Sequence, residues 1–220
     1  MRSVFKSFLA LFTAATLLPV LALAFQSPLS DEAVREAYFL GQRHDESMAR
    51  ALSRYTQFLP PPETGPHIYS VTFYTPFALL VQHSSRQLNY SAQQAAKDHH
   101  ADDETVLIEI QIFLTPSYAA VVPTPTGSRS DRHISFRLRP SDFWQTFKYQ
   151  VFDDNDELTV VNLTGEPTYT CFRGGPCDLN GAAVRIEFPA ATFTSDTASI
   201  LITPPEGDPV AVDFDLASLR

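Results

Sequence analysis

Little in this sequence points to catalysis. It has two cysteines, one tryptophan and eight glycines in 220 residues. It contains no G-x-S-x-G elbow, no H-E-x-x-H pair, no phosphate-binding G-x-x-x-x-G-K-S/T loop and no dinucleotide fingerprint. These absences lower the expectation of a well-known enzyme class, although two carboxylates that meet only in the folded chain would leave no such trace. No cofactor is expected.

Basic residues are also scarce, with 16 of them against 25 acidic residues. Two of the basic residues, Arg2 and Lys6, fall in the leader described next, which leaves 14 against 25 and a net charge of −11 with histidine neutral. A protein that binds nucleic acid or anionic lipid needs clustered lysine and arginine. We therefore expect no nucleic-acid partner.

Residues 1–24 have the pattern of a secretory signal peptide. Arg2 and Lys6 precede an apolar run at 8–18, and the small-x-small triplet at 22–24 ends the leader. An uncleaved anchor is the alternative, because the apolar stretch is almost long enough to span a bilayer. Pro19 and the triplet favour cleavage, and Phe25 in place of a cysteine excludes lipid attachment there. We expect an exported protein, periplasmic or secreted, without a transmembrane segment after cleavage.

The two cysteines predict a disulfide. Cys171 and Cys177 enclose Gly174-Gly175-Pro176, a turn-forming group that brings the ends together, and an oxidising compartment preserves the bond. Free thiols, a redox pair and a metal site are the alternatives, but five intervening residues do not match C-x-x-C and no further zinc ligand lies nearby in sequence. A bond across so short a loop stabilises the fold by about 2 kcal/mol in the chain-entropy treatment.

The chain after the leader begins with helical patterns. Ser30 is a suitable N-cap for a helix that ends near Gly41, and Asp45 or Ser47 suits a second helix that runs to Leu59. We expect these two helices to pack as a hairpin within residues 25–62, ended by the prolines at 60–62. Two shorter helices are predicted near 76–98, after a strand at 67–75.

From Thr105 onward, apolar and polar residues alternate. Four segments show this most clearly: 106–114, 133–139, 184–188 and 210–216. In the second segment the predicted core face is Ile134, Phe136 and Leu138. Such alternation is typical of antiparallel strands with one face buried, and turn residues at 153–156 and 204–209 join neighbouring strands. We predict an α+β protein whose mainly β domain, residues 63–220, forms an antiparallel β-sandwich or an open, barrel-like sheet.

One acidic segment contains candidate metal ligands. In "KDHHADDE" (97–104), His99, His100, Asp102 and Asp103 combine imidazole with carboxylate, as a divalent metal requires. Adjacent histidines point in different directions on a helix or strand, so only an irregular loop would bring them together. A metal-assisted hydrolase is the alternative function on these residues. The simpler interpretation is a solvated connection before an apolar strand.

Three further residues are candidates for ligand binding. Arg137 and Arg139 share one strand face and could bind a carboxylate or phosphate, although pairing with Glu109 or Asp213 across the sheet is the competing interpretation. Trp144 could stack on a sugar or a peptide if it is exposed. Large aromatic side chains are more often buried, which is the alternative for Trp144.

Two stretches, "EAYFLGQR" (36–43) and "ITPPEGDPVAVDFDL" (202–216), resemble segments of exported bacterial proteins of unknown function. The resemblance covers the two ends of the chain after the leader and implies a helical start with a strand-rich end. It brings no catalytic or binding residue with it. Because the strand pattern lacks catalytic motifs, we expect a non-catalytic module of the cell envelope or secreted space that binds a peptide, a glycan or a partner protein.

Overall fold

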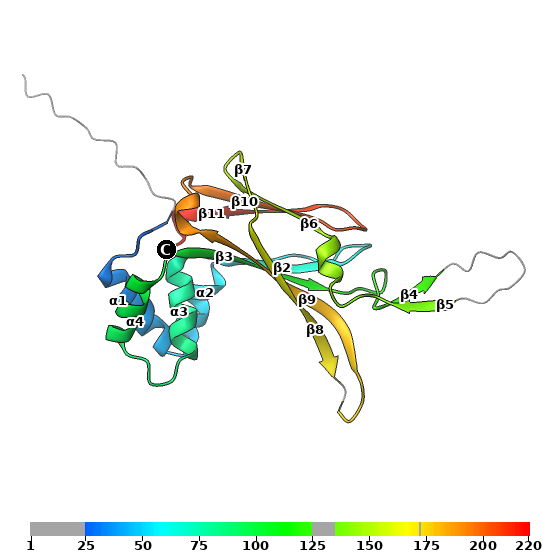
Figure 1. Ribbon diagram of the computed structural model, residues 1–220, viewed down its shortest axis with the longest axis horizontal. Coiled ribbons are helices and arrows are strands. Elements are labelled where there is room, and N and C mark those ends of the chain that lie inside the picture. Colours follow the sequence, from blue (N-terminus) through cyan, green and yellow to red (C-terminus); the bar gives the residue numbers. More distant parts are fainter. Residues whose placement is uncertain (1–24, 125–134, 172) are drawn as a thin grey trace, which may run out of the picture.

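The computed structural model describes residues 25–124, 135–171 and 173–220, so the predicted leader at 1–24 lies outside the described residues. Two antiparallel sheets pack face to face, and the helices gather at one end of them (Figure 1). The predicted α+β class with antiparallel strands is confirmed, and the sheets stay open instead of closing into a barrel.

The larger sheet has five strands. Their order is β1 (Thr56–Phe58), β2 (His67–Tyr74), β3 (Thr105–Phe113), β9 (Cys177–Pro189) and β8 (Asn162–Cys171). The smaller sheet has four, in the order β11 (Val210–Asp215), β10 (Thr197–Thr203), β6 (Lys148–Asp153) and β7 (Asp156–Leu158). Single 3₁₀ turns lie at Phe143–Thr146, Ala190–Thr192 and Leu216–Ser218.

The main core lies between the two sheets, and strand alternation selects its members. Ile108 and Ile110 of β3 are fully buried, whereas Glu109 between them faces outward. Ile200 and Ile202 of β10 belong to the same cluster from the opposite sheet. The alternation seen in the sequence therefore assigns the inner and outer faces of these strands correctly.

Four helices cover the end where β2 stops and β3 starts: α1 (Asp31–Gln42), α2 (Glu46–Ser53), α3 (Pro76–Arg86) and α4 (Ala92–Ala101). The predicted N-cap of α1 is present, because the Ser30 side chain accepts a backbone N–H bond, and Ser91 caps α4 in the same way. The packing differs from the expected hairpin of the first two helices: α1 packs mainly against α3. Gly41 makes this close approach possible, since a Cβ there would lie 2.4 Å from the Val81 carbonyl oxygen.

The expected second helix is shorter than the sequence suggested. It ends at Ser53, and Thr56–Phe58 form β1 instead, paired with the edge of β2. The Thr56 and Thr72 hydroxyls lie 2.9 Å apart across this pair. The physical reason is tertiary, because a free strand edge offers backbone partners that a helix at this position would leave unused.

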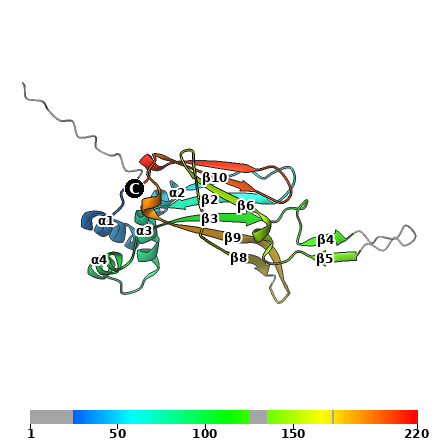
Figure 2. The same cartoon turned by 45° about the horizontal axis from the view of Figure 1, so that its top comes forward.

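The strand predicted at 133–139 is also placed differently. β4 (Val121–Thr124) and β5 (Ser135–Leu138) form a separate two-stranded ribbon that projects beyond the sandwich (Figure 2). Phe136 and Leu138, predicted to face the core, are 67% and 74% exposed, and Ile134 lies outside the described residues. Alternation shows which residues share a face but does not show whether anything covers that face.

Candidate functional site

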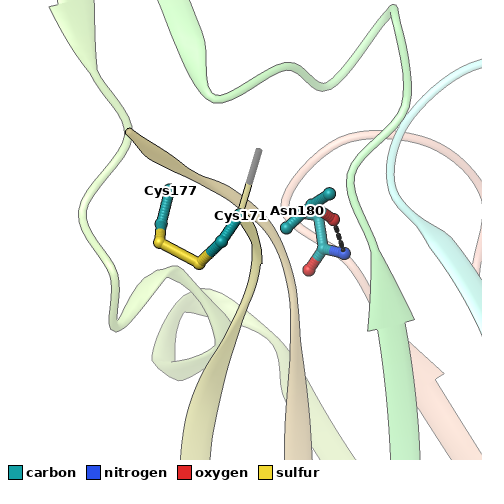
Figure 3. The surroundings of a disulfide bond; sticks show 4 residues. Cys171, Cys177 and Asn180 are labelled. Atoms are coloured by element: carbon teal, nitrogen blue, oxygen red, sulfur yellow. Dashed lines mark hydrogen bonds between the residues drawn. A yellow bond between two sulfur atoms is a disulfide. The ribbon is translucent and has the colours of Figure 1, made fainter. Parts of the chain in front are cut away.

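Cys171 and Cys177 face each other at the exposed end of the β8–β9 pair and form a disulfide (Figure 3). The prediction from their spacing is confirmed. Beside the bond, Asn180 Nδ2 donates to Thr170 Oγ1 at 2.7 Å, which adds a second link between the two strands. Because both sulfurs are bonded to each other, neither is a thiol nucleophile or a metal ligand.

The two candidate histidines form separate pairings, and neither pairing includes Asp102 or Asp103. His99 Nε2 lies 3.0 Å from Glu104 Oε1, and both side chains are nearly buried. His100 Nε2 lies 3.1 Å from Asp31 Oδ1 at the start of α1, and this pair is exposed. Within the described residues, no three or more His, Cys, Asp or Glu side chains gather as a metal ion would need. The metal-assisted hydrolase stays a prediction, which elemental analysis of the purified protein for zinc, manganese or iron tests.

Glu104 also fixes the first residues of the described chain. Its Oε1 accepts the backbone N–H of Leu29 at 2.6 Å, and its Oε2 accepts the Ser27 hydroxyl at 2.6 Å. With His99 as a further partner, this one carboxylate ties residues 27–29 and α4 to the start of β3. Sequence reasoning had placed Glu104 only among the charges of the 97–104 segment.

A hollow of about 990 Å³, here called the end hollow, lies next to these contacts. It is lined by residues 27–29, 99–100, 102–105, 161–162 and 187–191, which come from four separate parts of the chain. Apolar side chains form much of the lining: Pro28, Leu29, Val161, Phe188, Pro189 and Ala190. Val161 is 87% exposed, so this part of the lining is open to solvent.

The polar part of the end hollow is acidic. Asp102, Asp103, Glu104 and Glu187 line it, and none of its lining residues is lysine or arginine. Glu187 Oε2 accepts a bond from Asn162 Nδ2 at 2.6 Å, whereas Asp102 and Asp103 are exposed at the end of α4. A helix C-terminus carries a partial negative charge, so these two carboxylates add to a field of the same sign. The electrostatic field at this edge of the hollow is therefore negative, and the remaining titratable lining residues are His99 and His100.

Arg137 and Arg139 do not pair as the competing interpretation suggested. Glu109 pairs instead with Arg185, at 3.1 Å between Oε2 and Nε. The Arg139 guanidinium lies 3.4 Å from the centroid of the Tyr118 ring, and its Nε donates to the Ala119 carbonyl at 3.0 Å. Arg139 thus fastens the base of the ribbon, whereas Arg137 is exposed on β5.

Trp144 lies in the main core and not on a binding surface. Its side chain is 7% exposed, and its indole ring packs on the backbone of Gly165 in β8. An indole covered on its faces has no surface for stacking on a sugar or a peptide. The structure therefore brings none of Arg137, Arg139 and Trp144 together with the candidate metal ligands.

A row of aromatic side chains that sequence reasoning missed lies on the outer face of the larger sheet. Tyr69 of β2 is its centre, with ring centroids 5.4 Å from Phe58, 5.1 Å from Phe113 and 5.7 Å from His67. Phe58 and Tyr69 are 64% and 40% exposed. The row depends on the pairing of β1, β2 and β3, including a register irregularity between Ile68 and Ser70. The local sequence pattern predicts neither this pairing nor the irregularity.

A smaller hollow of about 400 Å³ shares residues 99 and 102–105 with the end hollow and is also lined by Tyr90. Tyr90 donates its hydroxyl to Asp98 Oδ2 at 3.0 Å. Burial first, and the neighbouring Asp98 second, raise the pKa of Tyr90 to about 12. A phenol with so high a pKa stays protonated near neutral pH, so it is a hydrogen-bond donor there and not a base.

None of the helices in the described ranges is both long and apolar enough to cross a bilayer. No protein-family model matches the chain, and no curated protein matches it. The geometry of the end hollow and of the aromatic row is therefore what supports a function.

Proposed function

We propose that this chain is an exported, non-catalytic binding module whose end hollow holds a peptide segment with apolar and basic side chains. One observation carries the proposal: the same hollow combines an apolar lining with four carboxylates and no lysine or arginine. Export is supported by the signal pattern at 1–24 and by the disulfide between Cys171 and Cys177.

The size and chemistry of the end hollow suit such a ligand. Its volume of about 990 Å³ is close to the upper end of the range of about 300–1,000 Å³ found for ligand pockets. Covering Val161, Pro28 and Pro189, which are exposed, would remove hydrocarbon from water, which favours binding; Leu29, Phe188 and Ala190 are already buried. The exposed carboxylates of Asp102 and Asp103 would attract arginine or lysine and exclude acidic ligands.

A fluorescently labelled peptide of alternating leucine and arginine tests the proposal by fluorescence anisotropy. We expect the protein to bind this peptide and to reject the same peptide with glutamate in place of arginine. Val161→Arg should weaken binding about tenfold or more, because it places a bulky cation in the hollow. Leu88→Arg is the matched control, since Leu88 is equally exposed at 91% but does not line the hollow.

Both variants replace exposed side chains, so both should fold like the original protein, which far-UV circular dichroism checks. Equal affinities of the original protein and Val161→Arg would place the peptide elsewhere and would contradict the proposal. Equal loss in Val161→Arg and Leu88→Arg would show that net charge, and not this hollow, controls binding.

The aromatic row favours a second candidate, a glycan ligand. Exposed rings on the outer face of a sheet offer apolar surfaces on which the faces of sugar rings can pack. Calorimetric titration with cellohexaose and chitohexaose tests this candidate. We expect binding that Tyr69→Ala abolishes and Phe39→Ala preserves, because Phe39 is similarly exposed, at 55%, but lies on the helix α1 and not on this sheet. Absence of binding to both oligosaccharides would exclude these two glycan classes.

A further inference from the structure

We infer that the contacts around Arg220 form a binding site for an arginine side chain. Arg220 occupies this site in its own chain, and an arginine of a partner peptide can take its place. The site, here called the arginine site, consists of Glu36, Tyr55, Thr75 and Phe77. None of these residues lines the end hollow, so the inference goes beyond the proposed function.

A carboxylate and an aromatic ring hold the guanidinium group. Arg220 Nη1 donates to Glu36 Oε1 at 2.6 Å. The guanidinium carbon also lies 5.2 Å from the centroid of the Phe77 ring, and Phe77 is otherwise buried. A carboxylate beside an aromatic face is the combination that suits the planar, charged guanidinium. The chemistry of this part of the site therefore fits arginine.

Two buried hydroxyl groups hold the backbone of the same residue. The Tyr55 hydroxyl donates to the Arg220 carbonyl oxygen at 3.2 Å and accepts the Arg220 N–H at 3.3 Å. The Thr75 hydroxyl donates to the same carbonyl oxygen, and both Tyr55 and Thr75 are buried. These bonds do not involve the Arg220 side chain. The guanidinium can therefore leave Glu36 and Phe77 while the backbone of residue 220 stays in place.

Three parts of the chain meet around this one side chain. Glu36 lies in α1, Tyr55 directly precedes β1, and Phe77 lies in the first turn of α3, which Thr75 caps. Each of these residues belongs to an element that packs independently of Arg220. The arginine site should therefore keep its shape when the Arg220 side chain is absent, as a site for an exchangeable ligand must.

The bound side chain is open to exchange. Arg220 and Glu36 are 58% and 50% exposed, and an ion pair so open to solvent contributes little stability. A hollow of about 220 Å³ lies beside the pair and is lined by Arg220, Glu36 and Phe77 among others. A second guanidinium can thus reach Glu36 from solvent without crossing the core.

Arg220 competes with the arginine of a partner because it belongs to the same chain. A group held near its site by a short connection has an effective concentration of roughly millimolar. An isolated arginine side chain from outside therefore binds weakly while Arg220 is present. A partner peptide must gain further contacts, and the adjoining hollow offers apolar ones at Leu40, Ala51 and Leu219.

Arg220→Ala empties the side-chain part of the site and allows a direct test. The probe is N-acetylarginine methylamide, titrated by NMR against the full chain without its leader. We expect Arg220→Ala to bind this probe in the millimolar range and the original protein to bind it at least about tenfold more weakly. N-acetylcitrulline methylamide has nearly the same shape without the charge and should bind to neither.

Two further variants identify the residues that bind the probe. Glu36→Gln combined with Arg220→Ala should weaken binding about tenfold, because the carboxylate partner is lost. Arg54→Ala is the matched control: it removes the same charge from the lining of the same hollow, but the cation that pairs with Glu36 is Arg220. Arg54→Ala should bind the probe no better than the original protein does.

These variants replace exposed or half-exposed side chains, and far-UV circular dichroism checks that they fold. A rise in the melting temperature of Arg220→Ala with the probe, larger than with the citrulline analogue, would support the inference by an independent measurement. Equal rises with the two compounds would contradict it.

The remaining outcomes are equally decisive. Equal affinity of the original protein and Arg220→Ala, no binding to Arg220→Ala, or equal gains in Arg54→Ala and Arg220→Ala would overturn the inference. Adding Val161→Arg to Arg220→Ala should leave the affinity for the probe unchanged, because Val161 lines the end hollow and not this site. A loss of binding in that double variant would place the probe in the end hollow and overturn the inference without affecting the proposed function.

Discussion

At Gly165 the absence of a side chain makes room for the single tryptophan. A Cβ at this position would lie 2.5 Å from the indole of Trp144, which is closer than atoms in van der Waals contact. We expect Gly165→Ala to lower the free energy of unfolding by about 1–3 kcal/mol, because the buried ring must shift. Urea unfolding measures this change.

A double-mutant cycle shows whether the effect comes from this contact. In a Trp144→Leu background the smaller side chain leaves space for the new methyl group, so the additional cost of Gly165→Ala should shrink. An equal cost in both backgrounds would mean that the loss comes from the β8 backbone and not from the indole.

The raised pKa of Tyr90 predicts that the folded protein loses stability in alkali. Its pKa is about 12 in the folded protein and near 10 when unfolded, so the folded chain holds the proton more tightly. The resulting stabilisation is complete below pH 10 and disappears as the pH rises toward 12. Urea unfolding from pH 9 to about 12 should therefore show a shallower decline for Tyr90→Phe than for the original protein.

Asp98→Asn offers a check on the cause of the Tyr90 shift. Replacing the carboxylate removes a negative charge beside the phenol, so the pKa of Tyr90 should fall. A steeper alkaline decline for Tyr90→Phe than for the original protein would contradict the assignment.

At the scale of single elements, the sequence predicts well whatever depends on neighbouring residues. Ser30, Thr75 and Ser91 begin their helices because their hydroxyls can accept local N–H bonds. The alternation of 106–114 similarly identifies the buried face of β3, since a pleated strand turns every second side chain inward. These features are local, and short-range chemistry determines them.

The features that sequence reasoning missed depend on distant partners. Thr56–Phe58 form a strand because β2 has an edge with which they can pair. The helix α1 packs against α3 because Gly41, without a side chain, allows the two helices to approach closely. The apolar face of β5 resembles a core face in the sequence, since the same alternation occurs in a buried strand and in this exposed ribbon.

The contacts of Glu104 predict that this carboxylate holds residues 27–29 in place. Glu104→Ala would remove the acceptor of Leu29 N–H, of the Ser27 hydroxyl and of His99 together. We expect the free energy of unfolding to fall by about 2–3 kcal/mol, because buried donors lose a charged partner. Ser27→Ala removes one of these bonds and should cost about 1 kcal/mol in the same urea experiment.

Protease sensitivity distinguishes this role of Glu104 from a general weakening. Cleavage close to residues 25–30 should become faster in Glu104→Ala than in Ser27→Ala, while the rest of the chain stays resistant. Equal stability of Glu104→Ala and the original protein would show that the carboxylate does not anchor this segment.

The disulfide joins β8 to β9, and we expect its removal to change the free energy of unfolding about as much as Glu104→Ala does. The double variant Cys171→Ser with Cys177→Ser should lower the free energy of unfolding by about 2 kcal/mol, because the unfolded chain regains the freedom that the bond removes. Urea unfolding under non-reducing conditions measures the difference. Unchanged stability would mean that the exposed tip opens independently of the sandwich.

At the scale of the whole molecule, the account depends on the arrangement of parts that are far apart in sequence. The histidines and carboxylates of 97–104 make this segment a candidate site in the sequence. The end hollow is also lined by residues 27–29, 161–162 and 187–191, which the sequence does not connect with it. Composition agrees with the acidic lining of this site, since the chain has 25 acidic residues against 16 basic ones. Only the fold shows that the β4–β5 ribbon projects at one end of the sheets while the helices gather at the other (Figure 1).

The position of a bound peptide tests this arrangement most directly. The leucine–arginine peptide with one terminal cysteine is mixed with Val161→Cys under mild oxidation, and disulfide-linked products are identified by mass spectrometry. The account predicts linkage at position 161 in excess over linkage at position 88 in a Leu88→Cys control. Linkage at position 88 as frequent as linkage at position 161, or no linkage at peptide concentrations that change the anisotropy, would contradict it.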